Sequence, residues 1–346
     1  MPHDSDAPRA RGLAELDQLY ALIDRLGNDA WVEQLAVVEH RELRLPILAV
    51  MIGAREPTAP TFALVGGVHG LERIGTQVIL AYLTTLTSLL QWDGMLRAGL
   101  TRCRIALLPM VNPVGIALQR RANGNGVDLM RNAPCVGGFA TPLVGGHRWS
   151  PRLPWFRGSA EGPMEVETLA LCEFVRRWVS CASASVLVDV HSGFGLVDRL
   201  WFPWARTRRP IPQLAEILAL ANLVDATLPN HVYRIEPQAS SYTALGDVWD
   251  HLYDEQRRLR EDQPFLPFTL ELGSWMWIKK NPRQLMRQLG WFDPVRPHRL
   301  QRTLRRHLAL FDVLQRASAA PEAWSGHDAP TRAAMTRAAF ARWYGS

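Results

Sequence analysis

The stretch Leu64-Val65-Gly66-Gly67-Val68-His69-Gly70-Leu71-Glu72 decides how the rest of the chain is interpreted. An apolar run ends in two glycines, and a histidine and a glutamate three positions apart follow. Side chains at i and i+3 lie on the same side of a helical turn, so His69 and Glu72 can reach one point. An imidazole nitrogen and a carboxylate oxygen are both zinc ligands. The pair alone is weak evidence for a metal site, because a surface His and Glu at a helix start have the same spacing.

Short apolar segments and amphipathic segments alternate around this stretch. The segments that predict buried strands are 62–66, 104–110, 186–190, 200–204 and 268–272, and those that predict helices are 13–26, 74–90, 163–180, 212–226, 249–261, 297–317 and 330–344. Residues 36–42 and 43–53 predict two antiparallel strands at a sheet edge, where Pro46 is tolerated. Nearly all-apolar strands are typical of a sheet covered on both faces, so we expect an α/β fold.

The chain is expected to form one α/β domain with two appendages. Residues 1–12 predict a flexible tail, residues 13–318 the α/β domain, and residues 319–346 a helical C-terminal extension. The segment 112–162 between two strands is irregular and rich in glycine and proline. Long irregular segments in a compact domain usually carry function.

Composition excludes several classes of protein. The 346 residues are 47% hydrophobic and 21% charged, with a net charge of +6, which is typical of a globular protein. Arginine clusters occur without a nucleic-acid-binding motif, so we expect no nucleic-acid partner. The four cysteines show no paired spacing and predict free thiols in a reducing compartment. A polar N-terminus and the lack of long apolar windows predict a cytoplasmic protein without a membrane partner.

Polar residues stand where several of the predicted strands end. His191 closes the apolar run 186–190, Asn112-Pro113 follows 104–110, and Glu271 interrupts 268–272. Ligand sites in open α/β sheets lie at the carboxyl ends of the strands. A buried carboxylate is costly unless it is paired, bound to metal or functional. Together with His69, these residues predict one site on one rim of the sheet.

At this level of detail the chain resembles the zinc carboxypeptidases, in particular the carboxypeptidase A-like family. The matching stretches extend over residues 62–273 in the family's order and with compatible spacings. They are His69-Gly70-Leu71-Glu72, Asn112-Pro113-Val114-Gly115, Arg121 with Gly126-Val127-Asp128-Leu129-Met130-Arg131-Asn132, Asp189-Val190-His191-Ser192, Tyr242-Thr243-Ala244-Leu245-Gly246, and Thr269-Leu270-Glu271. The resemblance implies a mixed, mainly parallel sheet of about eight strands between helices.

The resemblance also implies roles at the reacting centre. One zinc ion per chain would be held by His69, Glu72 and His191, which leaves a position for water. Glu271 would be the general base that takes a proton from that water. Arg121 would stabilise the oxyanion on the attacked carbonyl, although its neighbour Arg120 is an alternative on sequence grounds.

Three further residues are implied around that centre. Arg131 would bind the carboxylate of the substrate, and Tyr242 would close over it from a loop, with Tyr253 as an alternative phenol. Asp128 would accept a hydrogen bond from the non-ligating nitrogen of His69. The expected substrate is therefore a peptide, or an N-acyl amino acid, that carries a carboxylate.

The chain departs from the family pattern at several positions. Met130 stands where the family usually has an asparagine that grips the terminal carboxylate, and methionine donates no hydrogen bond. Leu71 replaces an arginine that many digestive members have. Trp249, just before Asp250, gives no support for a preference for C-terminal lysine or arginine. The aromatic insert 133–162 is expected either to roof the cleft or to be a structural flap.

The favoured interpretation is a zinc-dependent hydrolase of peptide or amide bonds, and specifically a metallocarboxypeptidase. One alternative is a zinc deacylase or amidase of the aspartoacylase and succinylglutamate desuccinylase type, which also uses a His-x-x-Glu, a later histidine and a late glutamate. The other is a catalytically inactive binding protein without zinc. The segment around Asp128 and the Tyr242 motif favour the carboxypeptidase, and the intact ligand and base positions disfavour the inactive protein.

Overall fold

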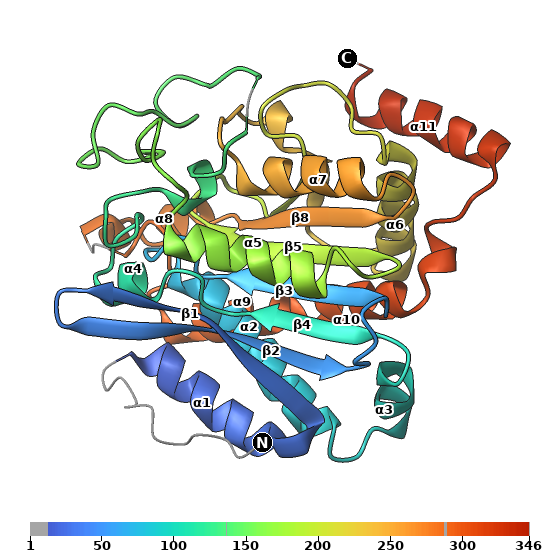
Figure 1. Ribbon diagram of the computed structural model, residues 1–346, viewed down its shortest axis with the longest axis horizontal. Helices are drawn as coiled ribbons and strands as arrows, with labels where there is room; N and C mark the ends of the chain where they lie inside the picture. Colours follow the sequence, from blue (N-terminus) through green and yellow to red (C-terminus); the bar gives the residue numbers. More distant parts are fainter. Residues whose placement is uncertain (1–12, 136, 287–288, 346) are drawn as a thin grey trace.

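One eight-stranded sheet organises the computed structural model, which describes residues 13–135, 137–286 and 289–345. The tail expected for residues 1–12 lies outside these ranges. The strand order is β1-β2-β4-β3-β5-β8-β6-β7 (Figure 1). The strands are β1 Ala30–His40, β2 Leu43–Gly53, β3 Thr61–Gly66, β4 Arg104–Leu108, β5 Ser185–Ser192, β6 Arg199–Phe202, β7 Arg234–Pro237 and β8 Phe265–Leu272.

The expected mixed, mainly parallel sheet is confirmed. Strands β4, β3, β5 and β8 are parallel to one another, whereas β2 runs antiparallel to both β1 and β4, and β6 antiparallel to β8. Every residue of β3, β5 and β8 is buried. Their nearly continuous apolar sequences fit this position, because a central strand contacts helices on both faces. The carboxyl ends of these three strands lie at the same edge of the sheet.

Helices cover both faces of the sheet (Figure 1). Helices α5 and α7 pack on one face, and α2 and α10 pack on the other. The α-helices are α1 Ala14–Leu26, α2 Arg73–Leu89, α3 Gly94–Leu100, α4 Pro113–Ala117, α5 Val166–Trp178, α6 Leu214–Thr227, α7 Val248–Leu259, α8 Trp275–Lys280, α9 Pro297–Arg306, α10 Leu308–Ala319 and α11 Ala329–Trp343.

Three local features differ from the sequence-based expectation. Residues 297–317 do not form one helix, because α9 and α10 are separate and His307 lies between them. Strand β7 and helix α3 were not expected, since both are short and β7 pairs only with β6 at the sheet edge. Strand β2 is internal, but its Pro46 pairs only with Val37 of β1, since β4 pairs with β2 only from Val50 onward. The missing N–H of Pro46 therefore removes no hydrogen bond between β2 and β4.

The break at His307 predicts a pH dependence of stability. Its buried Nδ1 lies 2.9 Å from the hydroxyl of Tyr233, and burial lowers the pKa of His307 to about 4. In the unfolded chain a histidine has a pKa of about 6.5. Below that pH the unfolded chain binds a proton that buried His307 does not bind, so the free energy of unfolding falls as the pH falls from about 6.5 toward 4. We expect His307→Gln to lack this loss, which amounts to about 1.4 kcal/mol per pH unit. Urea unfolding at several pH values between 7 and 4.5 measures it.

The matched control is His298→Gln, which changes an exposed histidine on α9. This variant should keep the pH slope of the unmodified protein. A slope that persists unchanged in His307→Gln would show that His307 is not its source.

The C-terminal helix α11 packs on helix α6 and contacts strand β6. Rings of Trp343 and Phe202 lie 4.9 Å apart, and Arg332 donates to Glu216 of α6 at 2.7 Å. Trp324, in the connection to α11, is fully buried and donates from its Nε1 to a backbone carbonyl of α10. The division of the chain at residue 318 stays a prediction.

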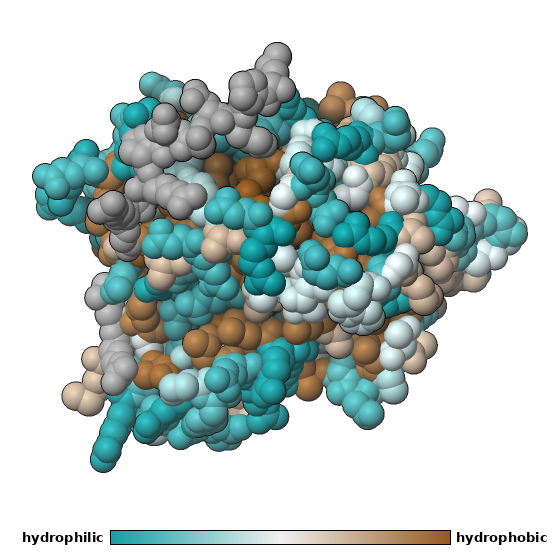
Figure 2. All heavy atoms as spheres, turned by 90° about the horizontal axis from the view of Figure 1, so that it is seen from below, coloured by the Kyte–Doolittle hydropathy of each residue, from teal (hydrophilic) through white to brown (hydrophobic). Residues whose placement is uncertain are grey.

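No single helix among residues 13–135, 137–286 and 289–345 is long and apolar enough to cross a membrane. Helices α2 and α3 reach the required length only as a pair, and they are bent by 111°. On the face seen from below, hydrophobic side chains reach the surface in areas separated by hydrophilic ones (Figure 2).

Candidate metal centre and active site

The loop between β3 and α2 holds the first two candidate ligands, His69 and Glu72, and glycines allow its close packing. A Cβ atom at Gly70 would lie 2.0 Å from the carbonyl carbon of Gly115 in α4. A Cβ atom at Gly75 would lie 2.3 Å from the carbonyl oxygen of Val190 in β5. Any side chain at either position would therefore force the elements apart. This close contact of α2 with β5 brings Glu72 next to the end of β5.

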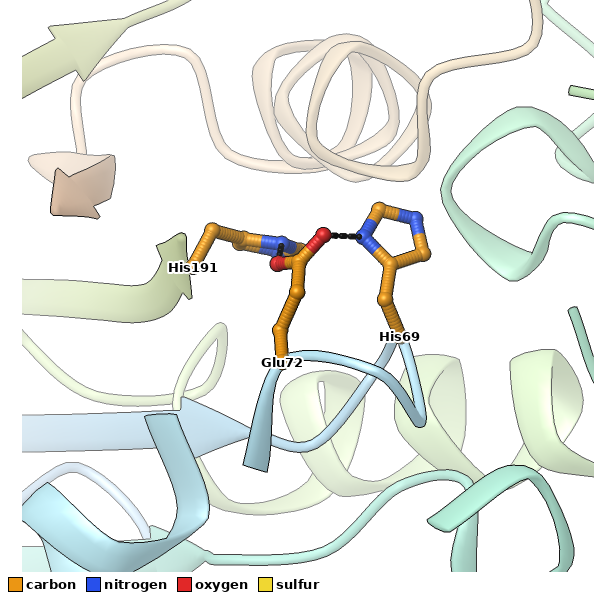
Figure 3. A group of neighbouring side chains, drawn as sticks. All are labelled: His69, Glu72 and His191. Atoms are coloured by element: carbon orange, nitrogen blue, oxygen red, sulfur yellow. Dashed lines mark hydrogen bonds and ion pairs between the residues drawn. The ribbon is translucent and has the colours of Figure 1, made fainter. Parts of the chain in front are cut away.

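His69, Glu72 and His191 converge there, with the carboxylate between the two rings (Figure 3). Nδ1 of His69 lies 2.8 Å from Oε1 of Glu72, and Nδ1 of His191 lies 2.9 Å from Oε2. One ligand atom from each of the three lies within 4.8 Å of the others. The three side chains are buried.

The far nitrogen of each histidine faces a second carboxylate. Nε2 of His69 lies 2.9 Å from Asp128, and Nε2 of His191 lies 2.6 Å from Asp189. A proton donated from Nε2 to a carboxylate leaves the Nδ1 lone pair directed at the common centre, which is the arrangement found around metal-binding histidines. Trp249 of α7 donates from Nε1 to the same oxygen of Asp189 at 2.9 Å.

This donor set fits one zinc ion. Two imidazole nitrogens and a carboxylate are its usual ligands in catalytic sites. Burial would raise the pKa of Glu72, but the two histidines outweigh burial and lower that pKa far below its usual range. Burial would lower the pKa of His191, but Asp189 and Glu72 raise it well above its usual value. A metal ion that binds there therefore displaces protons, and its affinity depends on pH.

Glu271 lies beside the metal centre on the neighbouring strand. His191 and Glu271 are register partners in β5 and β8. Oε1 of Glu271 accepts a hydrogen bond from the backbone N–H of Phe194 at 2.9 Å. Burial, together with the charge of Glu72, raises the pKa of Glu271 to about 8. A carboxylate with a pKa near neutrality is suited to accept and release a proton.

Arg121, and not Arg120, reaches the centre. Its Nε donates to Asp128 at 2.9 Å and its Nη1 to Glu72 at 3.2 Å. Arg120 instead donates to two backbone carbonyls of its own loop. Burial would raise the pKa of Asp128, but Arg121 and His69 hold that pKa well below its usual range.

Arg131 and Tyr242 lie together in another part of the site, where Arg131 supplies a positive charge and Tyr242 a phenol. Nη2 of Arg131 donates to the Tyr242 hydroxyl at 3.2 Å, and Nη1 lies 3.5 Å from Asp247. The Nε of Arg131 is buried without a partner among the described residues. Tyr253 lies elsewhere, where its hydroxyl accepts from the backbone of Gln213. Arg131 is therefore the candidate for binding a carboxylate, and Tyr242 is the adjacent phenol.

One cavity of about 390 Å³ is lined by the three candidate ligands and by Glu271, Arg121, Arg131 and Tyr242. The groups that support them, Asp128, Asp189, Asp247 and Trp249, do not line it. Leu71 and Met130, the two departures from the family pattern, both line it. From the insert 133–162, Val144, Pro154 and Trp155 line it as well, and the guanidinium of Arg121 lies 6.0 Å from the Trp155 ring. The insert thus contributes part of the cavity wall, while Trp149 within it is 77% exposed.

The structure corrects the expected position of Asn112. This side chain does not line the cavity, because its Oδ1 accepts from Gly115 at the start of α4 and its Nδ2 donates to the carbonyl of Val68. It fixes the backbone directly before His69. His191 closes the apolar run as expected, and β5 extends one residue beyond it, to Ser192.

Three contributors were not assigned a role from the sequence: Asp189, Trp249 and Asp247. Asp189 had a readable pattern, since it interrupts an apolar strand two residues before His191 and so shares its face. Asp247 had only the pattern of a helix cap, and it does accept from the N–H groups of Trp249 and Asp250. The contact of Trp249 with Asp189 joins residues 60 positions apart, which no local pattern reveals.

Trp249→Phe is expected to weaken zinc binding about tenfold, because it removes the donor that holds Asp189 against His191 and keeps an aromatic ring. Competition with a chromogenic chelator measures the affinity. Trp324→Phe is the control, since Trp324 is also buried and donates from Nε1, but far from the site. Equal zinc affinity in Trp249→Phe and the unmodified protein would reduce Trp249 to a packing residue.

Comparison with protein families and curated proteins agrees with this geometry. A family model described as zinc carboxypeptidase matches residues 38–276, more than half of the chain. Carboxypeptidase D of Mus musculus is 32% identical over 106 residues, which are 28% of this chain and 8% of that protein. Carboxypeptidase E of Caenorhabditis elegans is 34% identical over 171 residues, 45% of this chain and 35% of that protein. The chain thus matches well under half the length of these relatives.

Solved structures share the fold. Carboxypeptidase A from Helicoverpa armigera superposes with a TM-score of 0.64 at 19% identity, over 92% of this chain and 77% of that one. Thrombin activatable fibrinolysis inhibitor superposes with a TM-score of 0.62 at 20% identity, over 92% and 78%. With the family match and the metal-binding triad, these likenesses lead to one conclusion: the chain belongs to the zinc carboxypeptidase family.

Proposed function

We propose that the protein is a metallocarboxypeptidase that hydrolyses the last peptide bond of a substrate with a free C-terminal carboxylate. One observation carries this proposal. The triad, Glu271 and the Arg131–Tyr242 pair line a single cavity. The candidate metal ligands and proton acceptor thus share one cavity with a cationic group and a phenol.

His69, Glu72 and His191 would hold the zinc ion, which when bound polarises a carbonyl and lowers the pKa of water. Glu271 accepts the proton of the attacking water and delivers it to the departing amine. The backbone N–H of Phe194 holds the Glu271 carboxylate in place for both transfers.

Arg121 stabilises the negative charge that develops on the attacked carbonyl oxygen. Its Nε and Nη1 are held by Asp128 and Glu72, and no described residue accepts from its Nη2. A guanidinium fixed in this way needs no reorganisation when charge develops. Asp128 therefore positions two groups at once, Arg121 and the ring of His69.

Arg131 binds the terminal carboxylate through its planar donor fork, and Tyr242 lies beside it as a second donor. Asp247 orients the guanidinium from behind. Met130 adds no donor at this end. The terminal carboxylate of the substrate is thus bound by an arginine and a phenol, without a side-chain amide at position 130.

The test compares three substrate series with matched side chains: peptides with a free C-terminus, the same peptides as C-terminal amides, and N-acyl amino acids. Zinc-loaded protein is incubated with each, and the products are identified by mass spectrometry. We expect release of the last residue from the free peptides and not from the amides. Cleavage of N-acyl amino acids without cleavage of any peptide would contradict the proposal and favour a deacylase.

A further inference from the structure

The side chains of four residues that line the cavity have no role in the hydrolysis proposed above. Phe194, Trp201, Gln238 and Thr269 line it beside the Arg131–Tyr242 end. Thr269 and Glu271 are two positions apart in β8 and share a face, and Trp201 of β6 is the register partner of Thr269. We call these four residues the side pocket.

Aromatic rings form the walls of the side pocket and connect it to Tyr242. The ring of Trp201 lies 5.5 Å from that of Phe194 and 5.7 Å from that of Tyr242. Phe194 and Tyr242 are 5.8 Å apart. Since Tyr242 contacts Arg131, a substrate whose carboxylate lies on Arg131 has its last side chain within reach of the side pocket.

Two polar groups in the side pocket lack partners. Gln238 is 6% exposed and Thr269 is 8% exposed. No described residue forms a hydrogen bond with the Gln238 carboxamide or with the Thr269 hydroxyl. Neither group is among the fully buried side-chain atoms that lack a partner, so their polar atoms are accessible, and both residues line the cavity. A ligand that covers them has to supply the hydrogen bonds that buried polar groups nearly always form.

None of the four side-pocket residues carries a charge. The carboxylate of Glu271 accepts from the backbone N–H of Phe194 at 2.9 Å and serves as the proton acceptor in the proposed function. The carboxylate of Glu236 accepts from Nε1 of Trp201 at 3.3 Å. It is already paired with Arg199 at 3.0 Å and with Arg234 at 3.2 Å. A basic side chain would find only carboxylates that are already engaged. The nearby cation, the Arg199 guanidinium 5.4 Å from the Phe194 ring, is paired with Glu236, so an acidic side chain would lose water without gaining an unpaired cation.

We infer that the side pocket selects a carboxamide side chain, that of glutamine or asparagine, on the residue that is released. This inference rests on the proposed function for the position of the substrate carboxylate. The carboxamide of Gln238 pairs reciprocally with that of the substrate, Thr269 offers a third polar contact, and the rings pack on the methylene groups. An aliphatic side chain would leave these groups buried and unpaired, which disfavours it about 10- to 100-fold.

The experiment measures kcat/KM for peptides that differ only in the last residue: glutamine, its apolar analogue methionine, its acidic analogue glutamate, and lysine. The N-acetyl derivatives of the same amino acids are measured in parallel. We expect glutamine to exceed methionine about 10- to 100-fold. Gln238→Met, a change of similar volume, should bring the ratio near one by lowering glutamine and raising methionine. Thr269→Val should lower the ratio less.

Gln315→Met is the control, because Gln315 is buried in α10 and does not line the cavity. It should leave the ratio unchanged, and zinc content is measured for every variant. Cleaved peptides with equal rates for glutamine and methionine would overturn the inference and leave the proposed function standing. A glutamine preference among N-acetyl amino acids alone would uphold the inference and overturn the carboxypeptidase. Failure to turn over any compound would overturn both.

Discussion

Glu271→Gln is expected to keep zinc and to lose about a thousandfold or more in kcat. Glutamine has the same shape and still accepts the hydrogen bond from Phe194 N–H, so the local structure has no reason to change. It cannot accept a proton from water at neutral pH. Because Glu271 is not one of the three ligand residues, zinc affinity should stay close to that of the unmodified protein.

The measurements are kcat with the best peptide substrate and zinc content by elemental analysis. Glu216→Gln is the matched control, since Glu216 is buried on α6 and pairs with Arg332, away from the cavity. It should retain activity. Turnover that survives in Glu271→Gln would mean that another group takes the proton, and the proposed mechanism would be wrong.

His69→Ala is expected to lose zinc and activity together. The change removes one of three ligands, and we expect the zinc affinity to fall by more than about 100-fold. It also leaves the Oδ1 of Asp128 without the ring that it faces at 2.9 Å, so Arg121 loses part of its support. Chelator competition measures the affinity, and peptide hydrolysis measures the activity.

The control for this variant is His231→Ala, which removes a histidine that pairs with Asp225 outside the cavity. Its zinc affinity and turnover should match those of the unmodified protein. If His69→Ala bound zinc as tightly as that control, His69 would not be a ligand and the metal site would have to be sought elsewhere.

The sequence predicted the sheet well because its central strands carry local information. Strands β3, β5 and β8 are short, apolar and flanked by helices, and their burial on both faces follows from that pattern. Strand β7 pairs only at the edge of the sheet and contains a proline, so its sequence resembles a loop. At the break between α9 and α10, His307 contacts Tyr233, 74 positions away, whereas the helical sequence pattern continues through the break.

The candidate site likewise combines residues that a local sequence pattern reveals with residues that only the fold brings together. His69 and Glu72 are three positions apart and could be paired from sequence, whereas His191 and Glu271 required the rule that sites lie at the ends of parallel strands. The sequence favoured Arg121 over Arg120, and the fold gives the physical difference, since both belong to the same loop and only Arg121 faces Asp128. The proximity of Arg131 to Tyr242, 111 positions away, was implied by the resemblance to the family and not by any local pattern. Contacts between distant residues are set by packing, which local patterns do not encode.

The structure shows where two departures from the family pattern lie. Met130 and Leu71 line the same cavity as Arg131. Neither side chain adds a hydrogen-bond donor for a substrate carboxylate to those of Arg131 and Tyr242. We therefore expect contacts between the side pocket and the side chain of the released residue to contribute much of the selectivity.

We expect one zinc ion in this cavity to be required for release of a C-terminal residue. The experiment removes the metal with a chelator, adds zinc back in steps, and follows both bound zinc and residue release from a peptide with a free C-terminus. We expect no activity in the metal-free protein and a linear recovery that ends at one zinc per chain. Activity without zinc, or bound zinc without any residue release, would show that the protein is not a zinc-dependent carboxypeptidase.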